Sequence, residues 1–481
     1  MQKQLLTAFL VVTTSVLYPQ SPAPNILVVL TDDMGYADLS VHNQEADVRT
    51  PNIDRLARSG ALCTAGYITA PQCIPSRAGL LSGRYQQRYG LDHNGTIPLP
   101  LTEKLIPERL KDAGYATGMA GKWHLEPNHQ QEEWIREHLP ELAEKKTFVP
   151  SDIPDKMKRA YRSDRRGFDD VFEGYINNYL TNYTLAGEDK ETSAENIPDY
   201  RLDIQTEAAL SFIRRHKEEP FFYYLSYFAP HVPLEAPSKY LDRFPGEMPE
   251  RRRHCLAMLS AVDDGVGRVQ DLLAELGLTE NTLVFFISDN GAPLKMIKED
   301  ITLDFKGGAW DGSLNTPFIG EKGMLSEGGI HVPFVVSWSG TIPAGQRYDH
   351  PVSSLDVAAT SLAAAGLPTA KELDGKNLLP HLNGTTTSAP HKYLFWRFWE
   401  QIAVRSGNYK YLRVGGREFL FDVTTDEHET NNLLGEHPRK ARKLARKLDR
   451  WTQSLKNPGV PGNPNQSETQ WYDFYFPKTE D

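Results

Sequence analysis

The chain has 481 residues, of which 40% are hydrophobic and 24% are charged. This length is enough for a large core and allows two or three domains, or one large α/β unit with a small appendage. The formal net charge of −10 argues against a nucleic-acid-binding protein, although a local cationic pocket could still hold an anionic substrate.

The first residues have the pattern of a signal peptide. Lys3 precedes an apolar run over residues 5–17, which is too short to span a membrane, and three prolines then end any helix. The alternative is an ordinary buried terminal helix. We expect residues 1–23 to direct export, to a periplasm or out of the cell, and we expect no membrane span.

Two apolar stretches are each followed by oxygen-bearing side chains. Residues 25–30 and 282–287 are continuously apolar after their first residues, Asn25 and Thr282, which is typical of strands that are covered on both faces. The carboxyl ends of parallel strands are where open α/β sheets place their sites. An isolated Asp-Asp pair would more often cap a helix or lie in a turn. Two such strand ends together predict an oxygen-donor cluster that suits Ca²⁺, or else Mg²⁺, rather than Zn²⁺; it consists of Asp32, Asp33, Asp289 and Asn290.

Residues 70–83, with the sequence APQCIPSRAGLLSG, predict a helix that begins at Cys73. The amide groups at a helix N-terminus favour negative charge. Arg77 lies one helical turn further on, so its guanidinium returns toward Cys73. Together these features form a receptor for a tetrahedral oxyanion such as sulfate or phosphate. The alternative is a buried cysteine beside a surface arginine.

Three further segments place cationic or titratable side chains near strand ends. Lys122 and His124 alternate after a predicted strand over residues 116–120, so they share one face. His231 lies between two prolines after an aromatic strand, and Lys322 lies in a glycine-rich segment. Each of these alone would more often be a solvated lysine or a structural histidine.

These motifs together resemble the formylglycine-dependent sulfatases, from residue 25 to about residue 434. The resemblance rests on Cys-x-Pro-Ser-Arg with the following Ala-Gly-Leu-Leu-Ser-Gly-Arg, on Gly-Lys-Trp-His-Leu, and on the acidic strand ends. It implies an alkaline-phosphatase-like α/β fold, in which helices sandwich a mostly parallel sheet. It also implies that a maturation enzyme converts Cys73 to formylglycine, which joins the acidic cluster in holding one calcium ion.

The resemblance implies a role for each candidate residue. A hydrated formylglycine attacks the sulfur, while calcium and Arg77 lower the pKa of the nucleophile and hold the sulfate oxygens. Lys122 and Lys322 neutralise the charge of the sulfuryl group during transfer. His231 protonates the leaving alcohol, and His124 then takes a proton from the second hydroxyl of the diol, which expels sulfate.

Two positions depart from the family pattern. Glu126 stands where the family usually has glycine, and we interpret it as variation in the wall of the pocket. His331 stands where the family usually has arginine, which alters either a structural contact or a substrate contact.

The composition near residue 384 is typical of a linker, so we expect a sulfatase catalytic domain over residues 24–384. Residues 385–481 are expected to form a small antiparallel sheet that is closed by a helix over 438–455. One face of this helix is basic. That face is either simply solvated or a binding surface for an anionic polymer.

The polar loops and the aromatic run over residues 395–399 favour a carbohydrate substrate. Trp396 could stack on a sugar and Arg397 could pair with a neighbouring sulfate; the alternative is that these rings pack a domain junction. The segments around Cys73 and Trp396 are also similar to those of marine carrageenan sulfatases, which favours a sulfated galactan.

Two other hypotheses are a phosphonate monoester or phosphodiester hydrolase of the same superfamily, and a non-catalytic binder of sulfated glycans.

Overall fold

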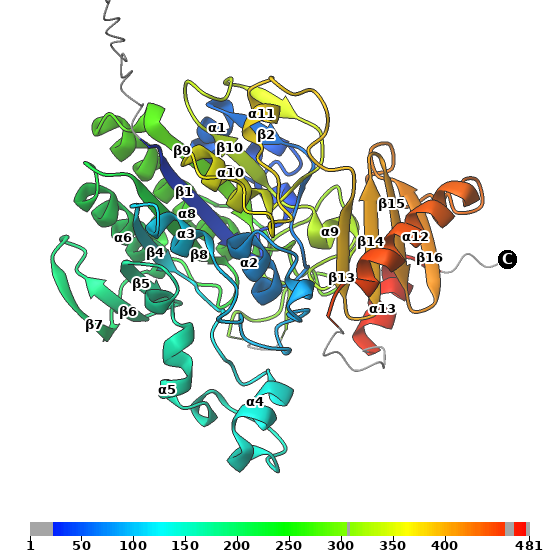
Figure 1. Cartoon of the computed structure of the whole chain (residues 1–481), viewed down its shortest axis with the longest axis horizontal. Coiled ribbons are helices and arrows are strands. Elements are labelled where there is room, and N and C mark those ends of the chain that lie inside the picture. Colours follow the sequence, from blue (N-terminus) through cyan, green and yellow to red (C-terminus); the bar gives the residue numbers. More distant parts are fainter. Residues whose placement is uncertain (1–22, 305–307, 457–465, 478–481) are drawn as a thin grey trace, which may run out of the picture.

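The computed structural model describes residues 23–304, 308–456 and 466–477 (Figure 1). Residues 1–22 of the predicted signal peptide lie outside these ranges, so that prediction is not tested. Within the described ranges, every helix is too short or too polar to cross a membrane.

A ten-stranded sheet forms the centre of the molecule, with the strand order β11-β2-β10-β9-β1-β8-β4-β5-β6-β7. β1 pairs in parallel with both β8 and β9, and β8 pairs in parallel with β4, so the middle of the sheet is parallel. From one edge to the other the strands are β11 (Gln346–Tyr348), β2 (Ala61–Cys63), β10 (Phe334–Ser337), β9 (Thr282–Ser288), β1 (Asn25–Asp32), β8 (Phe221–Pro230), β4 (Ala116–Gly121), β5 (Asp170–Gly174), β6 (Asn178–Tyr183) and β7 (Asp189–Asn196).

Helices cover both faces of this sheet (Figure 1). Ile26, Val28 and Leu30 of β1 belong to one hydrophobic cluster, while the alternate residues Leu27 and Val29 belong to another. The first cluster includes buried side chains of α2 (Cys73–Ser82), α3 (Ile106–Lys111) and α10 (Asp356–Ala364). The second includes those of α1 (Pro51–Arg58), α6 (Arg201–Arg215) and α8 (Glu250–Glu275). The α/β sandwich that the sequence predicts is therefore confirmed.

A second, four-stranded antiparallel sheet follows in the C-terminal part of the chain (Figure 1). The helix α12 (Pro438–Gln453) packs on it through Leu444, Leu448 and Trp451, as the sequence predicts. The boundary near residue 384 remains a prediction. The strands of the small sheet are β13 (Leu394–Phe398), β14 (Gln401–Ser406), β15 (Tyr409–Val414) and β16 (Arg417–Asp422).

Candidate active site

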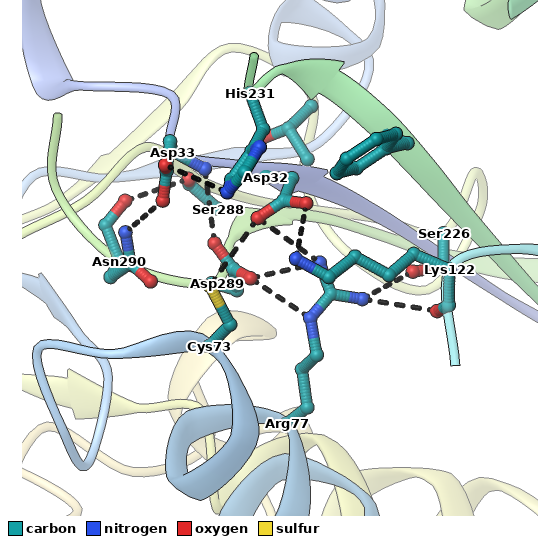
Figure 2. Close-up of polar contacts among 12 residues, drawn as sticks. Asp32, Asp33, Cys73, Arg77, Lys122, Ser226, His231, Ser288, Asp289 and Asn290 are labelled. Carbon is teal, nitrogen blue, oxygen red and sulfur yellow. Dashed lines mark hydrogen bonds and ion pairs between the residues drawn. The ribbon is translucent and has the colours of Figure 1, made fainter. Parts of the chain in front are cut away.

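The ends of β1 and β9 bring four carboxylate and amide side chains together at one edge of the sheet (Figure 2). Side-chain ligand atoms of Asp32, Asp33, Asp289 and Cys73 all lie within 4.8 Å of one another. Asn290 joins them because its Nδ2 donates to Oδ1 of Asp33 at 2.5 Å. Neighbouring parallel strands end side by side, which is why residues 257 positions apart in the chain meet here.

Cys73 is the first residue of α2 and is buried at the edge of this cluster. Its Sγ lies 3.6 Å from Oδ1 of Asp32 and 3.3 Å from Nζ of Lys322. Burial raises the pKa of the thiol to about 12, although Lys122 and Lys322 oppose the shift. Because the thiolate is the reactive form of cysteine, Cys73 in its unmodified state is a poor nucleophile.

Arg77 is fully buried and connects three elements of the site (Figure 2). Its Nε and Nη2 lie 2.9 and 2.8 Å from Oδ2 of Asp289. Its Nη1 donates to Oγ of Ser226 at 2.6 Å and to the main-chain oxygen of Lys122 at 3.1 Å. The guanidinium is therefore held in one orientation, one turn of α2 away from Cys73.

The two lysines reach the cluster from different segments. Nζ of Lys122 lies 2.6 Å from Oδ2 of Asp32, and Nζ of Lys322 lies 2.6 Å from Oδ1 of Asp33. Burial opposes ionisation of Asp32, but Lys122 and other neighbouring cations hold its pKa well below the usual range. Together with Arg77 there are three cations for three carboxylates, so a divalent cation would make the site net positive and suited to an anionic ester.

A glycine allows the Lys122 segment to approach the cluster. Gly121 ends β4 with φ of +92°, and a Cβ at this position would lie 1.9 Å from the main-chain oxygen of Ser226. That same oxygen accepts a hydrogen bond from the backbone N–H of Lys122 at 2.8 Å. The first residue of the Gly-Lys-Trp-His-Leu motif is thus required by close packing against β8.

The two candidate histidines are linked through aromatic rings. Nε2 of His231 lies 3.7 Å from Oδ2 of Asp33, and its Nδ1 donates to the main-chain oxygen of Val232 at 2.6 Å. His231 stacks on Phe228, which makes an edge contact with Tyr175, which in turn makes an edge contact with His124.

His124 has a left-handed backbone, with φ of +61°, and its Nδ1 is buried with no hydrogen-bond partner among the described residues. Burial lowers its pKa well below 6.5, and Lys122 adds to this effect. His124 is therefore neutral at pH 7 and able to accept a proton.

The donor set fits a hard cation. Oδ1 of Asn290 is buried and has no hydrogen-bond partner among the described residues, which is costly unless the atom has another electrostatic partner. Three buried carboxylates surround the same point. Carboxylate and amide oxygens are ligands that Ca²⁺ and Mg²⁺ prefer, and no histidine belongs to the cluster of potential metal ligands found in the described ranges.

Two predicted substrate contacts are wrong in this structure. Trp396 is only 1% exposed, and its Nε1 donates to the main-chain oxygen of Ile68 at 2.7 Å. Arg397 is 3% exposed, and its Nε and Nη2 lie 2.7 and 3.0 Å from the two oxygens of Asp92. Both side chains are used within the protein and neither is available to a sugar. The alternative, that the rings pack the junction to the C-terminal sheet, matches these contacts.

The two departures from the family pattern have different surroundings. His331 is buried, with Nδ1 2.9 Å from Oε2 of Glu327 and Nε2 2.8 Å from the main-chain oxygen of Thr64, so its contacts are structural. Glu126 is partly exposed two residues after His124, and it accepts a hydrogen bond from the Tyr175 hydroxyl at 3.4 Å. Glu126 therefore lies in the wall of the site beside a candidate histidine.

Sequence reasoning missed Ser226, Tyr175 and Phe228. Ser226 was detectable as a polar residue within a strand that is otherwise apolar and aromatic. Tyr175 follows β5 and Phe228 lies in β8, and neither gave such a signal, because aromatic residues in or next to strands are most often part of the core.

This geometry defines an α/β protein with a site of buried cations and oxygen donors that suits an anionic ester, and comparison with known proteins identifies the family. The sulfatase family model matches residues 24–367, and the model of the C-terminal part of N-sulphoglucosamine sulphohydrolase matches residues 319–457. N-acetylgalactosamine-6-sulfatase of Sus scrofa is 35% identical over 411 residues, which cover 80% of this chain and 71% of that protein. The uncharacterized sulfatase YdeN of Escherichia coli (strain K12) is 30% identical over 415 residues, covering 79% of this chain and 69% of that protein.

A solved structure supports the same assignment. The crystal structure of Ps i-CgsB in complex with k-i-k-neocarrahexaose superposes with a TM-score of 0.73 at 27% identity, covering 94% of this chain and 97% of that one. The chain belongs to the sulfatase family and has its alkaline-phosphatase-like fold. It is a sulfuric ester hydrolase, so the hypothesis of a non-catalytic glycan binder is wrong.

Proposed function

We propose that this sulfatase removes sulfate from a sulfated galactan, using a formylglycine made from Cys73 and a Ca²⁺ ion. The observation that carries the proposal is the position of Cys73, at the N-terminus of α2, within the cluster of carboxylates and cations. When present, formylglycine would supply the nucleophilic hydroxyl, and Ca²⁺, held by the four oxygen-donor side chains, would stabilise negative charge on the sulfate.

The three cations of the site bind and neutralise the sulfate group in this proposal. Arg77 is fixed by Asp289 and Ser226, so it keeps its orientation when a substrate enters. Lys122 and Lys322 come from different segments of the chain. Nζ of Lys122 lies 2.6 Å from Oδ2 of Asp32, and Nζ of Lys322 lies 2.6 Å from Oδ1 of Asp33. Buried, pre-oriented cations stabilise the charge that develops on the sulfate oxygens more strongly than water does.

The two histidines transfer protons. Nδ1 of His231 already donates to a main-chain oxygen, so Nε2 would deliver a proton to the leaving sugar oxygen from the doubly protonated imidazolium. Burial lowers the pKa of His231, but the neighbouring carboxylates Asp32 and Asp33 favour the imidazolium form. His124, which is neutral because it is buried near Lys122, accepts a proton when sulfate is released. The aromatic rings of Tyr175 and Phe228 separate the two histidines and fix their planes.

The identity of the substrate is supported by the relatives. One is named for N-acetylgalactosamine and another was solved with a neocarrahexaose, and both of these sugars are based on galactose. Export through residues 1–23 and maturation by a formylglycine-generating enzyme are part of the same proposal.

The proposal is tested by measuring sulfate release from defined sulfated oligosaccharides. Sulfated galactan oligosaccharides should be desulfated with a kcat/KM at least about tenfold above that of sulfated glucosamine disaccharides, because the site would be shaped for the galactose configuration. Phosphonate monoesters and phosphodiesters are the matched controls for the superfamily alternative. Preferred hydrolysis of those phosphorus esters, or release of sulfate from simple aryl esters only, would refute the substrate assignment.

A further inference from the structure

The helix α12 carries an unusual concentration of positive charge for a chain with a net charge of −10. Its sixteen residues include seven lysines and arginines and one aspartate, Asp449, which pairs with Arg413 of β15. Among the described residues, none of the seven cations has an ion pair or a side-chain hydrogen-bond partner. They are Arg439, Lys440, Arg442, Lys443, Arg446, Lys447 and Arg450.

These cations have a regular arrangement. Arg439, Lys443, Arg446 and Arg450 are exposed and recur at spacings of four, three and four residues, so they form one stripe along the helix. At 1.5 Å per residue the stripe is about 16 Å long. A row of like charges without counter-charges is unfavourable by itself, and an extended polyanion would relieve the repulsion.

A groove of about 380 Å³ runs beside the stripe, between α12 and the small sheet. No carboxylate lines it, and two half-buried tyrosines contribute their rings. Nζ of Lys440 lies 3.1 Å from the centre of the Tyr409 ring, and Nζ of Lys447 lies 5.6 Å from that of Tyr393. Cations held on aromatic faces beside an open groove provide both charge and flat surfaces, which suit a charged sugar chain.

The arrangement does not suit insertion into a membrane. A helix that inserts into the surface of a bilayer needs an exposed apolar face. In α12 the apolar residues Leu444, Leu448 and Trp451 are buried against β14, β15 and Tyr85, so no apolar face remains free.

We propose that α12 and its groove form a second binding surface, separate from the catalytic cluster, for a distant segment of a sulfated polysaccharide chain. The polyanionic character of the ligand follows from the charges on α12, whereas its identity as a galactan rests on the proposed function. Binding at this surface would raise the local concentration of long substrate chains at the active site, and it would be irrelevant to short ones.

The test compares two double variants of the full chain. Lys443→Gln with Arg446→Gln removes two cations from α12, and the matched control, Arg214→Gln with Lys217→Gln, removes one arginine and one lysine that are exposed in and after α6. Binding of a polysulfated galactan is measured at low salt in a Cys73→Ala background, which prevents turnover. The α12 variant should bind about fivefold to tenfold more weakly and show a shallower dependence on salt, while the control stays within twofold.

A kinetic comparison complements the binding experiment. In the active enzyme the α12 variant should raise KM for the polymer several-fold, while kcat/KM for a sulfated disaccharide stays the same. Equal Kd and KM values for the two double variants would overturn the proposal. The proposal would also be overturned if the α12 variant bound anionic vesicles or duplex DNA more weakly than the unsubstituted α12 does, but bound the galactan equally well. If the enzyme desulfates no galactan, the binding measurement with the Cys73→Ala chain still decides the role of α12.

Discussion

Arg77 places Nε and Nη2 at 2.9 and 2.8 Å from the same oxygen of Asp289, Oδ2, with both side chains fully buried. This pair joins the start of α2 to the end of β9, so it fixes the position of Cys73 relative to the acidic strand ends. Breaking a buried ion pair leaves an uncompensated charge, which costs about 3–5 kcal/mol.

The first prediction concerns this pair. Arg77→Lys keeps the charge but cannot reproduce the planar fork that contacts Asp289 and Ser226 together. We expect kcat/KM to fall by about 10² or more and the melting temperature to drop. Arg55→Lys, at a half-exposed ion pair with Asp271, is the control and should change neither value. Wild-type activity in Arg77→Lys would contradict the role of the guanidinium.

The second prediction concerns the nucleophile. Peptide mass spectrometry of protein produced together with the maturation enzyme should find an aldehyde in place of the thiol at position 73. Cys73→Ala should abolish turnover and leave the unfolding temperature nearly unchanged, whereas Cys63→Ala, at another buried cysteine, should retain activity. Full activity of protein that contains only unmodified cysteine at position 73 would contradict the mechanism, because burial keeps that thiol protonated.

The third prediction concerns the metal. Ca²⁺ added to chelated protein should raise the melting temperature and restore activity, since a ligand that binds only the folded state stabilises it. Asp33→Asn should reduce the thermal shift, because it removes one anionic ligand of the predicted site, while the exposed Asp271→Asn should leave it intact. Stabilisation by Zn²⁺ alone, with none from Ca²⁺ or Mg²⁺, would contradict an oxygen-donor site.

Local patterns are what made the site predictable from the sequence. The spacing of Cys73 and Arg77 depends only on the turn of one helix, and the acidic strand ends meet because parallel strands end at one edge. The ion pair between Lys322 and Asp33 joins residues 289 positions apart, and nothing local specifies it. The Trp396 and Arg397 prediction failed for the same reason. A run of aromatic and basic residues has the same composition in a core as on a sugar-binding face. Here Arg397 pairs with Asp92, 305 positions away in the chain, and this distant contact holds the run in the interior.

The fourth prediction concerns pH and the buried carboxylate Glu327. It accepts hydrogen bonds from the Tyr67 hydroxyl at 2.5 Å, from His331 at 2.9 Å and from Lys410 at 2.9 Å. Although burial opposes ionisation, Lys410 and then His331 hold its pKa well below the usual range. A carboxyl whose pKa is lower in the folded than in the unfolded state stabilises the protein above its unfolded pKa, and this contribution is lost as the pH falls.

Urea unfolding at several pH values measures this effect. Glu327→Gln should lower the unfolding free energy at pH 7 by about 1–3 kcal/mol, because Lys410 loses one of its two buried carboxylate partners and keeps only Glu429, whose Oε1 lies 2.9 Å from Nζ of Lys410. The difference from wild type should shrink as the pH falls from about 5 to 3. The exposed Glu132→Gln is the control and should follow the wild-type curve. A constant difference at all pH values would show that Glu327 acts through packing alone.

The last prediction separates acid catalysis from substrate binding at His231. A sugar alkoxide is a poor leaving group and needs a proton, whereas a nitrophenolate leaves almost unaided. His231→Ala should therefore lower kcat for a sugar sulfate by about 10²–10⁴, and lower that for nitrophenyl sulfate by less than about tenfold. His428→Ala, at an exposed histidine, should affect neither substrate. Because His231 stacks on Phe228 and lies beside Asp33, its loss could also disturb the site as a whole. That effect would lower both rates equally, so equal losses would mean that His231 positions the substrate or its neighbours and does not protonate the leaving oxygen.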